Sequence, residues 1–346
     1  MDRELNSSNR RQIDLATCNT VALGLNRFNA EADIKLGLQY EAAGNYAAAQ
    51  QSLLHACSVD HSYLPRWTLA NYYLRREDWP DFWKWARSAA EMPSGDIGAL
   101  FALCWRVTPD PAQITAQIAN NKPSFLRPYI GFLMSKRQTT AAAFMASRLA
   151  RHGSADSDQS TLLSVINCLA GDGDAGQAVS LWHLLIQRHW IVEDATLPNN
   201  AEFAREPLPV VFDWQIPQSS GLHSVVGSSG LETVFSGNEQ GQCTIANQMV
   251  AVSPGDYSLR YTYQTTGIPP GSGLRWEILN ADTKVVLGQS SSLSSEEGTQ
   301  TSFNFSVPAS APLIDLRLAY QSSLGTSRIS GTLTMQSTRI EVQPSS

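Results

Sequence analysis

The chain has 346 residues, 42% of them apolar, and its 31 acidic and 25 basic side chains give a net charge of −6. This apolar content can bury sizeable cores, which excludes disorder over the whole length, and the length predicts two or three domains. The mild acidic balance disfavours sequence-independent nucleic-acid binding, which needs a basic surface.

The first 29 residues are predicted to form an N-terminal extension or helix. The opening MDRELNSSNRRQ is polar and lacks the apolar stretch of a signal peptide. No apolar run approaches the roughly 18–20 residues of a membrane span. We therefore expect no membrane span in this chain, and a fragment of a longer, membrane-anchored protein remains an open alternative.

A repeated pattern of small and large residues begins near residue 31 and returns 33 residues later. Small residues would let two helices approach closely, and Tyr40, Tyr46 and Leu53 would fill the gaps between them. The positions that define the two copies are Leu36, Gly37, Tyr40, Gly44, Tyr46, Ala49 and Ala56, then Leu69, Ala70, Tyr73, Trp79 and Ala89. This spacing resembles the tetratricopeptide (TPR) repeat.

Further helices are expected over residues 96–107, 111–120, 124–136, 139–152, 158–170 and 174–190. Residues 30–194 are thus predicted to form about five TPR-like hairpins, which stack into a solenoid because one repeat cannot bury its apolar face alone. Such solenoids usually present a groove to a partner protein or peptide. A helical spacer without a ligand is the alternative.

The composition changes near residue 195. Residues 210–346 carry only 6 basic and 10 acidic side chains and are rich in Ser, Thr and Gly. Apolar and polar residues alternate there, as over 257–263, 274–278, 303–307, 316–320 and 331–342. Short strands between turn signals predict an antiparallel β-sandwich over residues 195–346. The fold class is therefore a multidomain α + β chain, with a helical solenoid followed by a sandwich.

Several short segments resemble one family of bacterial proteins. They are Asn199-Asn200-Ala201-Glu202-Phe203, Phe212-Asp213-Trp214, Gly273-Leu274-Arg275-Trp276 and, in the helical part, Pro65-Arg66-Trp67-Thr68-Leu69-Ala70-Asn71. The chain resembles TPR proteins with a C-terminal galactose-binding-like jelly roll, similar to carbohydrate-binding modules. The resemblance implies a role in exopolysaccharide or cell-envelope systems and an envelope or periplasmic location. The cytoplasm stays open because no signal peptide is visible.

No catalytic, metal or cofactor motif is found. The five Cys form no CxxC pair, and His183 and His189 fall on different faces of one predicted helix. Asp172 and Asp174 imitate the start of a calcium loop without its Glu at the twelfth position, so Asp174 is expected to cap a helix. We expect a non-enzymatic protein with no cofactor and no metal. A glycan-active enzyme would need two carboxyl groups roughly 5–10 Å apart.

The candidate binding residues come from the alternation in the predicted strands. Tyr257, Tyr261, Tyr263 and Trp276 share a face with leucines and are expected to pack in the core. The glycan-binding candidates on the opposite face are Arg260, Gln264, Arg275, Glu277 and Arg317, with Arg328 near the last turn. If their strands adjoin, they form an Arg-bearing surface that suits an acidic polysaccharide. The alternatives are a solvated face with internal ion pairs and a structural role for Arg328.

The sequence therefore predicts a scaffold or adaptor. Its solenoid would bind a partner protein or peptide, and its jelly roll would bind a polysaccharide. The alternative is a purely protein-binding scaffold with no sugar affinity. An aromatic platform or Arg cluster on the exposed face would favour glycan, and a flat apolar patch would favour protein. Nucleic acid is not an expected partner.

Overall fold

The computed structural model describes residues 17, 20–22, 24, 28–92, 97–119, 121–192, 194, 196–322 and 328–343. The extension expected over residues 1–29 lies almost wholly outside these residues, as does Cys18. The chain forms two compact units, residues 1–153 and 154–346. This division differs from the expected boundary near residue 195, which follows the change from helices to strands.

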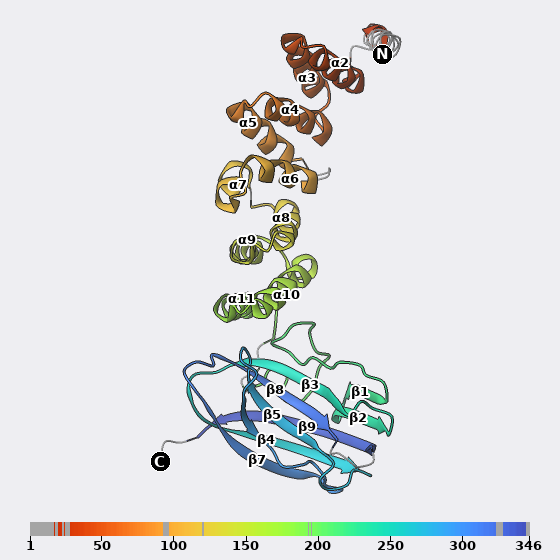
Figure 1. Cartoon of the computed structure of the whole chain (residues 1–346), viewed down its shortest axis with the longest axis vertical. Coiled ribbons are helices and arrows are strands. Elements are labelled where there is room, and N and C mark those ends of the chain that lie inside the picture. Colours follow the sequence, from red (N-terminus) through yellow and green to blue (C-terminus); the bar gives the residue numbers. More distant parts are fainter. Residues whose placement is uncertain are drawn as a thin grey trace, which may run out of the picture. The chain divides into compact units, whose positions relative to one another are not determined.

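The first unit contains antiparallel helical hairpins, and two further helices over residues 97–118 pack on the neighbouring hairpins (Figure 1). Asn45 and Asp78 begin the second helix of the first two hairpins by accepting hydrogen bonds from the backbone N–H groups of Ala48 and Asp81. Its described helices are α2 (Ala30–Ala42), α3 (Tyr46–Val59), α4 (Tyr63–Arg75), α5 (Trp79–Ala90), α6 (Ile97–Val107), α7 (Pro111–Ile118), α8 (Pro123–Ser135) and α9 (Thr139–His152).

Most of the positions that define the repeat are buried where the helices meet. Gly37 allows the closest approach of α2 and α3, because a Cβ there would lie 2.7 Å from Cγ of Leu53. Gly44 adopts the left-handed conformation that the turn requires (φ +77°). Leu36, Ala49, Leu53 and Ala56 of the first copy and Leu69, Ala70, Tyr73 and Ala89 of the second are buried.

Two large residues of the repeat behave differently from the prediction. Tyr46 and Trp79 are 41% and 43% exposed, so the expectation that Tyr46 fills a gap between helices is wrong. Both are the first residue of their helix, where the side chain reaches the rim of the hairpin. The ring of Tyr46 instead carries the guanidinium of Arg76, 3.7 Å from the ring centroid.

The second unit begins with a helical hairpin, α10 (Ala155–Gly171) and α11 (Ala175–Gln187). Asp174 caps α11 by accepting from the N–H of Gln177 at 3.2 Å, which confirms the predicted cap. Asn167 of α10 ties the hairpin to the chain that leads into the sandwich. Its Nδ2 donates to the carbonyl of Pro209 and its Oδ1 accepts from the N–H of Val211, both at 2.9 Å.

The sandwich has two antiparallel sheets in a jelly-roll arrangement, as expected (Figure 1). One sheet has the order β1-β2-β9-β4-β7 and the other β3-β8-β5-β6. The described strands are β1 (Leu222–Gly227), β2 (Gly230–Ser236), β3 (Gln242–Ala251), β4 (Gly255–Thr266), β5 (Leu274–Asn280), β6 (Val286–Gln289), β7 (Thr299–Val307), β8 (Leu313–Gln321) and β9 (Ser330–Val342).

Alternation along these strands builds the core between the sheets. Tyr257, Tyr261, Tyr263 and Trp276 are all buried there, which confirms their predicted place. Trp276 packs against Trp214 and Tyr261, with ring centroids 6.0 and 6.2 Å apart. Among the described residues, no helix is long and apolar enough to cross a membrane.

Candidate functional site

A polar surface covers the outer side of the sheet β3-β8-β5-β6. Leu274, Trp276 and Ile278 of β5 point into the core, so Arg275 and Glu277 point outward. Register places Glu277 opposite Arg317 of β8, and Arg317 opposite Asn247 of β3. Three adjacent strands thus contribute one row of polar side chains.

A groove of ≈ 630 Å³ lies along this face. Its walls come from β3, β5 and β8 and from the segments that precede β1 and β3. Five primary amides line it, from Gln218, Gln240, Gln242, Asn247 and Gln321. Three hydroxyl groups join them, from Ser219, Ser220 and Thr244. Each amide or hydroxyl group can both donate and accept hydrogen bonds.

The charges in and beside the groove neutralise one another. Arg275 pairs with Glu277 at 2.7 Å and also donates to Oε1 of Gln321 at 2.7 Å. Arg317 pairs with Asp315 at 2.6 Å, and this carboxylate is only 4% exposed. Arg275 and Arg317 are therefore each neutralised by a carboxylate on their own strand.

The lining of the groove is more polar than apolar. Tyr320 contributes to its lining, but the side chain is fully buried and packs against Phe235 on the core side. Burial raises the pKa of the Tyr320 phenol. Cys243 also reaches the lining, and burial raises the pKa of its thiol, with a further rise from the nearby Glu239 carboxylate. Hydrogen bonding rather than ring stacking is therefore the means of recognition that this face offers.

The six predicted binding residues do not form one surface. Arg275, Glu277 and Arg317 come together because β5 and β8 are neighbours. Arg260 and Gln264 lie on β4, in the other sheet, and this separates them from the groove. Arg260 pairs with Glu341 at 3.1 Å, and Nε2 of Gln264 donates to the carbonyl of Glu296 at 2.8 Å. The expectation of a single adjoining Arg-bearing face is wrong, since β4 and β5 belong to different sheets.

Arg328 lies near one end of the groove. A Cβ on Gly241 would be 3.2 Å from Nη1 of Arg328, so this guanidinium sits against the backbone between Gln240 and Gln242. The sequence analysis missed the amide-bearing segment that contains these glutamines. Its only signal was a run of polar residues, Asn238 to Gln242, which is also what an ordinary loop shows.

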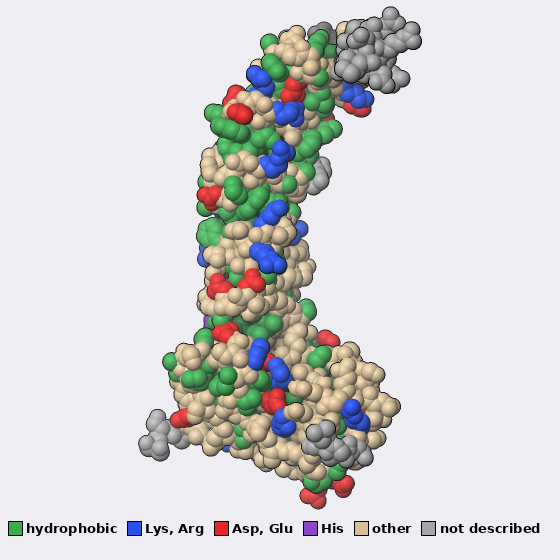
Figure 2. All heavy atoms as spheres, viewed as in Figure 1, with side chains coloured by type: hydrophobic (Ala, Val, Ile, Leu, Met, Phe, Trp, Pro, Cys, Tyr) green, Lys and Arg blue, Asp and Glu red, His purple; other side chains and the backbone are tan. Residues whose placement is uncertain are grey.

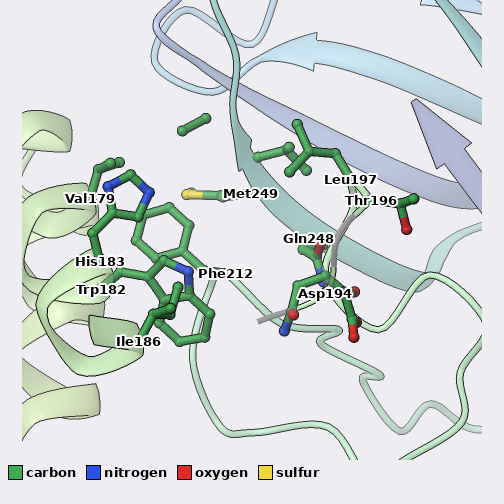
Figure 3. Close-up of a pocket in the computed structure, with 13 residues that line it drawn as sticks. Val179, Trp182, His183, Ile186, Asp194, Thr196, Leu197, Phe212, Gln248 and Met249 are labelled. Atoms are coloured by element: carbon green, nitrogen blue, oxygen red, sulfur yellow. The ribbon is translucent and has the colours of Figure 1, made fainter. Parts of the chain in front are cut away.

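A second cavity, of ≈ 90 Å³, lies between α11 and β3 within the second unit (Figure 3). Figure 3 shows Trp182, His183 and Ile186 of α11 on one side and Met249 of β3 on the other, with Phe212 beside Trp182. The rings of Trp182 and Phe212 are 5.7 Å apart. This cavity is small, and apolar side chains make up most of its lining.

The described residues contain no group of three His, Cys, Asp or Glu side chains that could hold a metal ion. Glu277 is the only carboxylic acid among the described residues that line the groove. The four cysteines in the described ranges, Cys57, Cys104, Cys168 and Cys243, are free thiols.

No family model matches the chain, and no curated protein matches it in sequence. Solved structures are similar to its parts. A carbohydrate-binding module described under "CBM4 structure and function" is 16% identical, covers 42% of this chain and 99% of its own, and has a TM-score of 0.33. The N-terminal cellulose-binding domain of β-1,4-glucanase C from Cellulomonas fimi is 18% identical, with coverage of 38% and 90% and a TM-score of 0.29.

The helical part is similar to PilF from Pseudomonas aeruginosa. That structure is 17% identical, covers 53% of this chain and 86% of its own, and has a TM-score of 0.28. Each similarity concerns one part of the chain.

Proposed function

We propose that the second unit binds an uncharged oligosaccharide in the groove on the β3-β8-β5-β6 sheet, and that the helical first unit binds a partner protein. The observation that carries the glycan proposal is the lining of the groove. Sugar hydroxyls donate and accept hydrogen bonds, and five amides and three hydroxyl groups in the groove can do both. The protein is then an adaptor between a glycan and a protein.

The ion pairs favour a neutral glycan. An acidic polysaccharide would need an unpaired guanidinium, but Arg275 and Arg317 are already engaged by Glu277 and Asp315. The earlier expectation of an acidic polysaccharide therefore gives way to a neutral one. Because each neutral hydrogen bond contributes only about 0.5–1.5 kcal/mol net, a single groove should bind weakly. Affinity would then come from several sugar units in a row.

The proposal is for binding without catalysis. Glycoside hydrolysis usually needs two carboxyl groups that flank the scissile bond. Glu277 is held by Arg275, and Asp315 is buried beneath Arg317. Only Glu277 lines the groove, and its pairing with Arg275 favours binding over hydrolysis. The envelope location implied by the resemblance stays a prediction, which cell fractionation with an antibody would check.

A glycan array probed with the full chain tests the proposal, followed by calorimetry on each positive glycan. We expect neutral oligosaccharides to bind, and Gln242→Ala and Asn247→Ala each to weaken binding several-fold. Gln300→Ala is the matched control, because Gln300 is an exposed amide on β7 of the other sheet. A folded protein that binds no glycan, or binding lost equally in all three variants, would leave the protein-only scaffold as the better explanation.

A further inference from the structure

Charge is distributed unevenly between the two units. Residues 1–153 contain 17 Lys and Arg against 13 Asp and Glu, whereas residues 154–346 contain 8 against 18. The imbalance is sharpest over residues 97–153, where seven basic side chains accompany a single carboxylate, Asp110. An otherwise acidic protein thus concentrates positive charge in the part that contains α6 to α9.

Hydrogen bonds bring two of these charges to one place. Nε of Arg148, on α9, donates to Oδ1 of Asn121 at 3.0 Å. Nε of Arg87, at the end of α5, donates to the carbonyl of Gln117 at 2.5 Å. Gln117 and Asn121 flank the connection between α7 and α8, so both guanidinium groups lie beside it. Figure 2 shows Lys and Arg side chains on the visible face over α8 and α9.

One face of α9 combines this charge with an apolar group. Phe144, Arg148 and Arg151 follow at intervals of four and three residues, which places them on the same side of the helix. Phe144 is 61% exposed, and Arg151 is exposed as well. Within the described residues, neither Arg148 nor Arg151 forms an ion pair with a carboxylate of the chain. We call Phe144, Arg148, Arg151 and the adjoining Arg87 the α9 surface.

We propose that the α9 surface binds an acidic segment of a partner polypeptide that carries an apolar side chain. Carboxylates of the segment would pair with the guanidinium groups, for which Arg offers a planar fork of donors. The apolar side chain would cover Phe144. This inference specifies the protein partner of the proposed function, and it is independent of the groove on the sandwich.

A polypeptide fits this surface better than a nucleic acid does. Nucleic-acid binding draws on a continuous basic track along the phosphate backbone. The basic residues of the α9 surface are few, and Glu91 follows Arg87 by one helical turn. A short acidic peptide with an apolar side chain matches the guanidinium groups of this surface and the exposed ring of Phe144.

The test uses the full chain and fluorescence anisotropy with three labelled probes. Two are short peptides rich in Glu, one with a central Leu and one with Ala in its place, and the third is a short oligothymidylate. We expect the Leu peptide to bind most tightly, with an affinity that falls as NaCl rises. Arg151→Glu should weaken the binding of both peptides about fivefold or more. Phe144→Ala should weaken the binding of the Leu peptide only.

Lys35→Glu is the matched control, because it makes the same charge change at an exposed side chain of α2 in the same unit. It should leave binding within twofold of the unchanged chain. The proposal is overturned if neither peptide binds, if Lys35→Glu and Arg151→Glu have equal effects, or if the two peptides bind equally. Tighter binding of the oligothymidylate with the same response to Arg151→Glu would assign the surface to nucleic acid instead. Glycan binding, measured on the same samples, reports separately on the groove.

Discussion

Glu277 on β5 and Arg317 on β8 stand directly opposite each other in register, yet each pairs along its own strand. Glu277 binds Arg275 and Arg317 binds Asp315, both two residues away on the same face. The charged residues of β5 and β8 on this face therefore form two separate ion pairs, each within one strand. This arrangement makes the surface polar without making it charged.

Asp315→Asn should change the preference of the groove. Loss of this carboxylate leaves the Arg317 guanidinium without its charged partner, so an oligomer of a uronic acid should begin to bind. The unfolding free energy should fall by about 1–3 kcal/mol, because a hydrogen-bonded pair is broken. Calorimetry with neutral and acidic oligosaccharides measures the first effect. Asp282→Asn, an exposed site in the turn after β5, serves as the control, and equal behaviour of the two variants would contradict the account.

Gly37→Ala should destabilise the helical unit. The added Cβ would meet Cγ of Leu53 at 2.7 Å and Cδ2 at 2.8 Å, with the backbone carbonyl oxygen of Ala49 at 3.3 Å. Overpacking of this kind typically costs about 1–3 kcal/mol, which exceeds the gain in helix propensity of roughly 1 kcal/mol. Urea unfolding followed by circular dichroism measures the change.

The matched control for that prediction is Gly131→Ala in α8. A Cβ at Gly131 meets nothing within 4 Å, so only the propensity gain remains. This variant should be as stable as the unchanged chain or up to about 1 kcal/mol more stable. If both variants lose stability alike, close approach of α2 and α3 is not the reason for glycine at position 37.

Asn167→Ala should loosen the attachment of the α10–α11 hairpin. The variant leaves the carbonyl of Pro209 and the N–H of Val211 without their side-chain partner. The free energy of unfolding should fall by about 1–3 kcal/mol, because two backbone groups lose a hydrogen-bond partner. Compared with the unchanged chain, the variant should show faster amide hydrogen exchange around residue 211 but not in the sheets. Asn304→Ala, at an exposed position of β7, should leave that exchange unchanged.

Stability should fall at alkaline pH. Burial raises the pKa of Cys57 to about 11 and that of Cys104 to about 12, from an ordinary value of 9.0. Between pH 9 and these raised pKa values, an unfolded thiol loses its proton while the folded thiol keeps it. The folded state therefore has its full stability below pH 9 and loses stability as the pH rises through 11 and 12. Cys104→Ala lowers stability at neutral pH but should flatten this alkaline decline. An unchanged slope in that variant would show that other groups cause it.

Local patterns revealed much of the fold. Small residues at repeat spacing identified the hairpins, and alternation at Tyr257–Tyr263 and Leu274–Ile278 identified β4 and β5 and their buried faces. The strands β1, β2, β6 and most of β3 were missed, and the run Gly227-Ser228-Ser229-Gly230 between β1 and β2 was read as a loop. Alternation gives the face of a residue within its own strand and says nothing about which strands become neighbours.

That limit explains the mixed outcome for the site. Arg260 and Arg275 have the same pattern in sequence, and both do point outward. Only the strand order separates them, because β4 pairs with β7 and β9 while β5 pairs with β6 and β8. The amides of Gln240 and Gln242 could not be singled out, since their importance comes from the neighbouring strands rather than from their own spacing.

The hydrogen bonds from Asn167 to Pro209 and Val211 also determine where the sandwich could be cut from the chain or fused to another protein. A protease cut near residue 195 would divide a compact unit, and a sandwich released there would leave behind the helix whose Asn167 anchors Pro209 and Val211. The transferable module, in the laboratory or in gene fusion, accordingly begins near Ser154 and carries a helical hairpin with it. A sandwich moved to another protein would keep the α10–α11 hairpin attached to it.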